Sequence, residues 1–235
     1  AQLHGEVGMM SLGQIYTFGP CFRAEKSATK KHLSEFYMVE PEMAFYSMED
    51  TIDMSEDLLK HTLISVLQYE DDFKRLEIST EHITSIIDKD WVRLRYEDVC
   101  EQFGLKFGED VSSEIEKALI DKYKVPVYVT HWPKDLKPFY MKKDDKYAYC
   151  FDLIFPEVGE LIGGSEREDS YDILKSEMEK SGLDMDKMQW YLNTRKWGSV
   201  PHAGFGLGFE RLLMYMTGMQ NIRDVIPFPR YPGFA

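Results

Sequence analysis

Apolar and polar residues alternate with a period of two in several short segments of the chain. Residues 14–22 are rich in β-branched and aromatic side chains, which favours a strand. Residues 35–46 alternate as well, and one face of that strand carries Phe36, Met38, Glu40 and Glu42. Because a polar loop separates the two segments, they predict an antiparallel hairpin with a long connection.

Helical spacing replaces this alternation over residues 47–67. Ser47 and Asp50 match a capping box. The apolar stripe that follows predicts a face packed on the core, and it consists of Ile52, Leu58, Leu59, Leu63 and Val66. Further helices are expected over 169–181, ended by Gly182, and over 184–196 and 209–216.

The remaining segments predict more strands and one insertion. Strands are expected from residue 125, over 146–155, over 158–162 and in the glycine-rich stretch 204–208. Residues 70–124 are charged and weakly periodic, with short helical patterns, so we expect an insertion packed on the rim with Trp91 as a packing anchor. Strands joined by hairpins, with helices clustered elsewhere, predict an α+β fold with a mostly antiparallel sheet.

Composition narrows the class of protein. The 235 residues include 43% apolar side chains, which is enough for a substantial core. No apolar run is long enough to span a membrane, and we expect no secretory leader from the first residues. The three cysteines are widely separated, so we expect a reduced compartment, cytoplasmic or organellar. With a net charge of −13 the chain is expected to be a poor general polyanion binder, and a nucleic-acid partner would need a local basic face or another domain.

Arg23 and Glu25 are the first candidates for chemistry. Alternate strand positions face the same way, so a fixed cation and a fixed carboxylate are expected side by side, next to the basic loop of Lys30, Lys31 and His32. Such cations suit a polyphosphate, with the rigid arginine at the reacting phosphate. The alternative is a structural Arg–Glu pair beside a solvated loop.

The stretch GFGLG at 204–208 is followed by Glu210 and Arg211. It matches neither a Walker loop nor GxGxxG. Glycines in a strand allow close approach of a flat ligand or another backbone, and Arg211 suits stacking on a base or binding phosphate. The alternative is a packed turn with a surface arginine.

Two further sets of polar residues lie around predicted strand ends. Asp152 and Glu160 flank a strand connection, and two carboxylates suit Mg²⁺ when phosphates supply the other ligands; a cap and a surface acid are the alternative. Arg167 and Glu168 follow Gly163-Gly164-Ser165. An arginine for the carbonyl and a carboxylate for the NH₂ suit an uncharged amide, although a surface ion pair has the same sequence pattern.

Together these stretches resemble the catalytic domain of the class II aminoacyl-tRNA synthetases of the aspartyl/asparaginyl group, and within it the asparaginyl-tRNA synthetases. FRAEKSATKKHLSEFYMVEPEMAF looks like motif 2 of the family, and GFGLGFERLLMYMTG with NIRDVIPFPR looks like motif 3. Both motifs are long and specific, and the similarity covers almost all of residues 1–235. It implies an ATP-dependent ligase of translation, which forms asparaginyl-adenylate and charges tRNA(Asn).

The resemblance also implies roles for single residues. Arg23 would hold the α-phosphate and the amino-acid carboxylate, and Phe36 and Arg211 would enclose the adenine. The other expected ATP contacts are Glu25, His32, Leu33, Glu160 and Gly208. Mg²⁺ would be carried by Asp152 and Glu160. The expected amino-acid contacts are Gln2, Glu6, Glu40, Ser165, Arg167 and Glu168.

The choice of asparagine over aspartate is expected to depend on local charge. The aspartyl relatives follow the arginine with an apolar residue and then His, whereas this chain has Glu168 and Asp169. The stretch PKDLKPFYM (133–141) also looks asparaginyl. A buried, unpaired Glu6 facing the ligand would repel aspartate.

The chain departs from the family pattern in places. Lys31 stands where arginine is usual, and Lys26 where asparagine is common. The OB-fold anticodon domain and motif 1 are absent, so we expect a partial sequence of a protein that is a homodimer at full length. The tRNA contact expected here is the acceptor end. The alternatives are an asparagine synthetase paralogue that amidates aspartate with ATP, an aspartyl-tRNA synthetase, and a non-catalytic synthetase-like binding protein.

Overall fold

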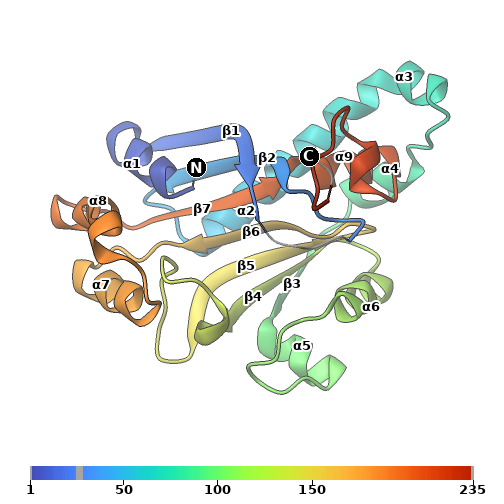
Figure 1. Cartoon of the computed structure of the whole chain (residues 1–235). Helices are drawn as coiled ribbons and strands as arrows, with labels where there is room; N and C mark the ends of the chain where they lie inside the picture. The colour runs from blue at the N-terminus through green and yellow to red at the C-terminus, as the bar shows by residue number, and fades with distance from the viewer. Residues whose placement is uncertain (1, 25–28, 234–235) are drawn as a thin grey trace.

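The computed structural model describes residues 2–24 and 29–233 (Figure 1). Strands of the described part form one seven-stranded sheet in the order β1-β2-β7-β6-β5-β4-β3. The strands are β1 (Gln14–Phe22), β2 (Glu35–Ala44), β3 (Val92–Arg95), β4 (Val127–Pro133), β5 (Tyr147–Phe155), β6 (Gly159–Glu166) and β7 (His202–Gly208). Neighbouring strands are antiparallel except β3 and β4. The predicted α+β class with a mostly antiparallel sheet is confirmed.

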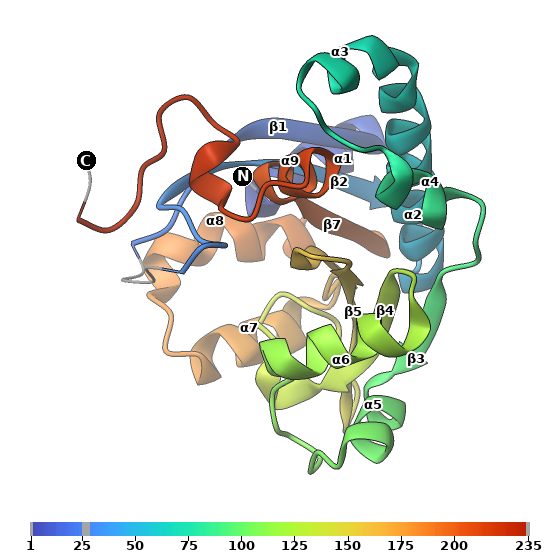
Figure 2. The same cartoon turned by 90° about the vertical axis from the view of Figure 1, so that its right-hand side faces the viewer.

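Helices surround this sheet on several sides (Figures 1 and 2). They are α1 (Gln2–Leu12), α2 (Met48–Val66), α3 (Glu70–Arg75), α4 (Glu81–Ile87), α5 (Tyr96–Phe103), α6 (Ser113–Tyr123), α7 (Tyr171–Lys180), α8 (Met185–Lys196) and α9 (Phe209–Thr217). Short 3₁₀ turns cover Leu67–Tyr69, Lys134–Leu136 and Ile222–Asp224. The predicted capping box of α2 is present: the Ser47 hydroxyl accepts from the Asp50 N–H, and Asp50 accepts from the Ser47 N–H.

The side chains of β5 show which face of the sheet is which. Phe151, Leu153 and Phe155 pack in the core that the apolar stripe of α2 covers. Cys150 and Ile154 point to the other face, where they pack with side chains of α5 and α6. Asp152 lies between these two, so the strand alternation turns its carboxylate away from α2.

The hairpin of β1 and β2 forms as predicted, with Cys21 opposite Phe36. However, β1 ends at Phe22, so Arg23 lies just beyond the strand and not on it. The Arg23 N–H still bonds the carbonyl of Ser34, at 2.9 Å, which ties the residue to the start of β2. The expected position of Glu25 lies outside the described residues.

Residues 70–124 are more than a rim insertion. Helices α4, α5 and α6 match the expected helical patterns, but β3 also lies in this segment and forms the edge of the sheet beside β4. Trp91 is 6% exposed and packs in the main core, where its indole N–H bonds the Ile86 carbonyl. The rim interpretation is therefore wrong for this edge strand, whose four residues are too few to give a clear period.

Two elements near the site were not predicted in full from the sequence. Helix α1 (Gln2–Leu12), to which the sequence pattern assigned no element, packs against β1 and β2. Strand β6 does not end before Gly163 but continues to Glu166, because Gly163, Gly164 and Ser165 pair with both β5 and β7. This extension carries the chain to the buried Arg167.

Candidate active site

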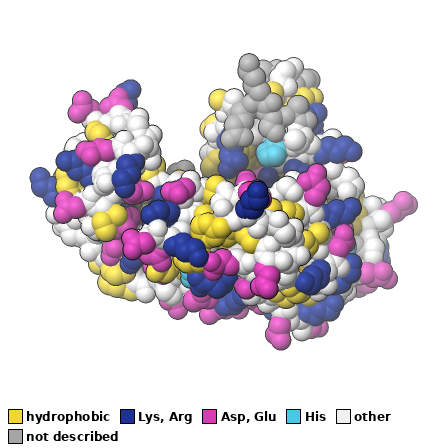
Figure 3. Space-filling view, turned by 90° about the horizontal axis from the view of Figure 1, so that it is seen from below, with side chains coloured by type: hydrophobic (Ala, Val, Ile, Leu, Met, Phe, Trp, Pro, Cys, Tyr) yellow, Lys and Arg dark blue, Asp and Glu magenta, His cyan; other side chains and the backbone are white. Residues whose placement is uncertain are grey.

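A pocket of about 690 Å³ opens on the face of the sheet opposite α2. Its walls come from α1, the β1–β2 hairpin, the segment around residues 136–141, β5, β6, β7 and the first turn of α9. The structure therefore brings the two motif-like stretches together with the residues that follow β6. Seen from below, the surface is deeply notched, and basic and acidic side chains are interspersed over the visible face (Figure 3).

One end of the pocket holds the residues expected to bind ATP. The Arg23 guanidinium lies over the Phe36 ring, 5.0 Å from its centroid. Arg211 donates from Nη1 to the carbonyl of Glu160 and lines the same pocket. Gly208 precedes α9 directly, and a Cβ there would lie 3.8 Å from the Arg211 side chain. Cationic and aromatic groups at this end form a surface that suits a flat base and its phosphates.

His32 and Leu33 complete this end. Nδ1 of His32 contacts the Thr29 hydroxyl, and the ring lines the pocket. Leu33 is 6% exposed, packs in the main core and also lines the pocket, so it forms part of an apolar floor. The structure thus places both residues in the pocket, although the loop between them and Arg23 is only partly described.

Asp152 and Glu160 approach each other over Gly163. An ideal Cβ on Gly163 would lie 3.1 Å from Oε1 of Glu160 and 3.5 Å from Oδ1 of Asp152. Burial, together with the charge of Asp152, raises the pKa of Glu160 to about 7. A buried carboxylate whose charge is disfavoured by a neighbouring acid is a site where a divalent cation would stabilise the ionised state, so the pair fits Mg²⁺. Among the described residues, no group of three His, Cys, Asp or Glu forms a metal site by itself.

Arg167 lies at the other end of the pocket and is 1% exposed. Its guanidinium binds Glu42 in a fork, with Nη2 to Oε1 at 2.6 Å and Nε to Oε2 at 3.2 Å, and Nη1 donates to the Ser165 hydroxyl at 2.6 Å. With its amide oxygen turned toward Arg167, Gln2 accepts from Nη1 at 2.9 Å and from Nη2 at 3.0 Å. Sequence reasoning expected Arg167, Ser165 and Gln2 here, and the structure brings them together.

The alternation along β2 predicts the strand face of Glu42, but no sequence pattern indicates a role for it. Its carboxylate is fully buried, and burial raises its pKa although the Arg167 charge opposes this shift. A Cβ on Gly204 would lie 2.4 Å from Glu42 Cδ, so a glycine is required opposite this carboxylate. The predicted close approach at the glycine-rich strand is thus made by a side chain of β2.

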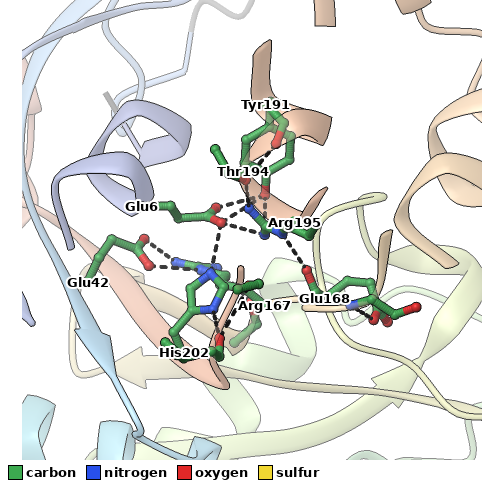
Figure 4. A network of polar contacts seen from close by, with 12 residues as sticks. Glu6, Glu42, Arg167, Glu168, Tyr191, Thr194, Arg195 and His202 are labelled. Carbon is green, nitrogen blue, oxygen red and sulfur yellow. Dashed lines mark hydrogen bonds and ion pairs between the residues drawn. The ribbon is translucent and has the colours of Figure 1, made fainter. Parts of the chain in front are cut away.

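Glu6 is not the unpaired carboxylate that was expected. It is fully buried and accepts from Arg195 Nη2 at 2.6 Å, from the Tyr191 hydroxyl at 2.8 Å and from His202 Nε2 at 2.9 Å (Figure 4). Burial raises the pKa of Glu6, but the His202 bond and the Arg195 charge outweigh it and leave the pKa below its usual value. Glu6 is also missing from the pocket wall, so the geometry does not support direct repulsion of aspartate by Glu6.

The carboxylate and the carbonyl of Glu168 are also hydrogen-bonded within the protein. Its carboxylate accepts from the Ser170 N–H at 2.8 Å, and its carbonyl accepts from Arg195 Nε at 2.8 Å (Figure 4). The side chain does not line the pocket next to Arg167. The expected pairing of these two adjacent residues around one amide is wrong, because successive residues of an extended segment point in opposite directions.

Glu40 lines the pocket between the two ends. It is 7% exposed, and it accepts from the Thr17 hydroxyl at 3.2 Å. It lies two positions before Glu42 on the same face of β2, as the alternation predicts. A buried carboxylate at this position suits the ammonium group of an amino acid.

Three further residues of the site were missed or left without a role. Lys137 and Tyr140 lie in the PKDLKPFYM stretch and line the pocket, and the Tyr140 ring lies 5.5 Å from the Arg167 guanidinium carbon. Their stretch was noted only as a sequence resemblance. Arg195 resembles an ordinary basic residue in the last turn of a helix, so no sequence pattern indicated its burial.

Comparison with known proteins agrees with this geometry. Residues 1–232 match the family model described as tRNA synthetases class II (D, K and N). The chain belongs to this family. It spans about half the length of the curated relatives that it matches. The asparagine–tRNA ligases of Azobacteroides pseudotrichonymphae and Haemophilus influenzae are 47% and 46% identical to it, and the match covers 100% of this chain and 54% of each relative.

Solved synthetase structures superpose on the same fold. The asparaginyl-tRNA synthetase of Pyrococcus horikoshii, complexed with asparaginyl-adenylate, has a TM-score of 0.94 at 33% identity and is matched over 100% of this chain and 56% of its own. The aspartyl-tRNA synthetase of Entamoeba histolytica has a TM-score of 0.86 at 28% identity, over 98% of this chain and 50% of its own. The class II catalytic fold is therefore shown. No helix among the described residues is long and apolar enough to cross a membrane.

Proposed function

We propose that this chain is the catalytic part of an asparagine–tRNA ligase. It would activate asparagine with ATP and then pass the asparaginyl group to the acceptor end of tRNA(Asn). Relatives named asparagine–tRNA ligase at 44–47% identity support this substrate. The observation that carries the proposal is a single pocket with Arg23, Phe36 and Arg211 at one end and the fixed Arg167 at the other.

The first step joins the two ends of the pocket. The asparagine carboxylate would attack the α-phosphorus of ATP in line, forming the acyl–phosphate bond while the bond to pyrophosphate breaks. Arg23 would hold the α-phosphate and the attacking carboxylate, and Arg211 would lie on the adenine opposite Phe36. This chemistry requires positioning and charge stabilisation and no protein nucleophile.

The metal and the outer phosphates would lie at the same end of the pocket. Asp152 and Glu160 would hold Mg²⁺, which when bound offsets the negative charge of the phosphates. Lys31 and His32 line this end and would contact the outer phosphates. Lys31 supplies charge without the fork of an arginine, so its phosphate contact is expected to be less directional.

The amino-acid end supports an uncharged side chain. Arg167 would donate to the amide oxygen of asparagine through the N–H groups that face Gln2 in this structure, while Gln2 and Glu40 would lie near the α-amino group of asparagine. Because Glu42 neutralises Arg167 in a buried fork, a second carboxylate from aspartate would enter without a compensating charge. An amide adds no charge, and its carbonyl needs only a donor.

Transfer to tRNA would follow at the same carbonyl. The terminal ribose hydroxyl would attack the acyl carbon, and AMP would leave as the ester forms. With a net charge of −13, the chain suits a contact limited to the acceptor end. A homodimer of the full-length protein and a cytoplasmic location are parts of the same proposal, supported by the family alone.

ATP–pyrophosphate exchange tests the first step. The purified chain should exchange label only when asparagine is added, and aspartate should support at least roughly 10³-fold less exchange. Formation of asparagine from aspartate, ATP and ammonia would instead indicate an amidating paralogue. No exchange with either amino acid, in a protein that binds ATP, would contradict the proposal.

A further inference from the structure

Lys137 is a largely buried cation to which the proposed reaction assigns no role. It comes from the PKDLKPFYM stretch, and its ammonium lies 2.5 Å from Oδ2 of Asp152. The two side chains are 14% and 13% exposed, and the ammonium also lies 4.0 Å from the centroid of the Trp132 ring. Packing on both sides fixes this cation beside one of the two carboxylates proposed for the metal.

One oxygen of Asp152 and one oxygen of Glu160 face the same point above Gly163. Asp152 Oδ1 and Glu160 Oε1 lie 3.5 Å and 3.1 Å from the position of an ideal Cβ on Gly163. Oδ2 of Asp152 faces Lys137 instead. The protein therefore offers a divalent cation one free oxygen of Asp152 and the carboxylate of Glu160, on a floor that has no side chain.

Charge decides how firmly such a pair would hold a metal alone. The groups that act on Glu160 are two acids, Asp152 and Glu116, and two cations, Lys137 and Arg211. The ammonium offsets part of the attraction of Asp152, and a divalent cation at the other oxygen of Asp152 would be repelled by a fixed positive charge a few ångströms away. Mg²⁺ usually keeps few protein ligands and completes its shell with waters and phosphates.

We infer that Lys137 is a built-in counter-ion that prevents the carboxylate pair from retaining a metal in the absence of nucleotide. Metal binding then depends on the phosphates of ATP, whose negative charge outweighs Lys137, so metal and nucleotide occupy the site together. The inference rests on the proposed metal site of Asp152 and Glu160. Lys137 acts here through Asp152 and is a positioning residue.

Direct Mn²⁺ binding tests this without measuring activity. Free Mn²⁺ is followed by its electron paramagnetic resonance signal in the wild-type chain and in Lys137→Met, with and without ATP. Methionine keeps the apolar stem against Trp132, and Lys137→Gln is a second neutral variant if the first unfolds, as judged by circular dichroism. Lys134→Met removes the same charge from the same short turn, outside the pocket wall.

We expect weak Mn²⁺ binding by the wild type and by Lys134→Met without ATP, and at least roughly tenfold tighter binding by the neutral variants at position 137. Adding Asp152→Asn to Lys137→Met should abolish this gain. Unchanged or weaker binding by the folded position 137 variants would overturn the inference, and so would an equal gain in Lys134→Met. Asparagine-dependent exchange is a separate measurement, so its failure would remove the proposed function and leave the Mn²⁺ result readable.

Discussion

Nη2 of Arg167 lies 2.6 Å from Oε1 of Glu42, and the two side chains are 1% and 0% exposed. The fork from Nε and Nη2 fixes the guanidinium in plane. Nη1 donates to Ser165, and the second N–H of each terminal nitrogen faces the amide oxygen of Gln2. A buried arginine held in this way is a directional donor with little net charge. This pair is the physical basis of the amide preference proposed here.

Glu42→Gln tests that basis directly. The substitution keeps an acceptor but leaves Arg167 with uncompensated charge, so the ratio of kcat/KM for asparagine to kcat/KM for aspartate should fall by roughly tenfold or more. Unfolding should cost about 3 kcal/mol less than in the wild type. Pyrophosphate exchange and urea unfolding measure the two effects. An unchanged preference in a folded variant would exclude Glu42 as the source of selectivity.

Glu35→Gln is the matched control for that experiment. Glu35 lies on the same strand and pairs with Arg230, whose Nε lies 3.0 Å from Oε2 of Glu35. Both side chains of this pair are partly exposed. Because exposed pairs contribute little, its stability should change by less than about 1 kcal/mol. The amino-acid preference should remain that of the wild type.

Glu6→Gln should act mainly on stability. The change leaves the buried Arg195 without its ionic partner, and we expect a loss of about 3 kcal/mol, with little change in the preference for asparagine. Glu97→Gln, which removes an exposed ion pair with Lys146, is the control. A large gain of aspartate activation in the exchange assay would show instead that Glu6 acts on the substrate.

The lowered pKa of Glu6 predicts that this residue contributes to the loss of stability in acid. The pKa of Glu6 is below its usual value of 4.5 in the folded chain, so the unfolded chain binds a proton first as the pH falls. The stability that Glu6 contributes is therefore complete above its unfolded pKa and is lost as the pH falls through its folded pKa. Unfolding measured across this acid range should show a smaller loss in Glu6→Gln than in the wild type.

Alanine substitutions at two adjacent glycines should affect ATP binding and folding stability separately. Alanine at 163 places a Cβ 3.1 Å from Glu160 Oε1, so Gly163→Ala should raise the KM for ATP several-fold in a chain of nearly normal stability. Alanine at 164 places a Cβ 2.4 Å from the Phe151 ring, so Gly164→Ala should cost about 1–3 kcal/mol of stability. Exchange kinetics and thermal unfolding of both variants test this. Equal effects of the two changes on the KM would contradict it.

Lys31→Arg tests the departure in the motif 2 loop. An arginine would bind the outer phosphates with a fork where Lys31 offers a single ammonium, so the KM for ATP should fall a few-fold at unchanged kcat. Lys30→Arg, one residue earlier and outside the pocket wall, should leave the KM unchanged. A rise in the KM of Lys31→Arg would mean that the site has no room for the larger group.

Local patterns predicted the elements that present the site. The alternation over Phe36, Met38, Glu40 and Glu42 gave a strand with two carboxylates on one face, and the structure keeps that face toward the pocket and Arg167. The capping box at Ser47 is also as predicted. Strand β3 and the length of β6 were missed, because a four-residue edge strand and a glycine pair carry almost no periodic signal.

The sequence alone determined the fold class, the two motifs and the chemical types of the site residues, since strand and helix periods and motif spacing are local properties. Only the tertiary structure decided which charges meet. Glu6 was expected to face a ligand, but it is bonded to Arg195 and His202, which lie 189 and 196 residues further along the chain. Lys137 meets Asp152, and Glu42 meets Arg167, across the same sheet. A buried charge requires a partner, and the identity of that partner is set by packing and not by distance along the chain.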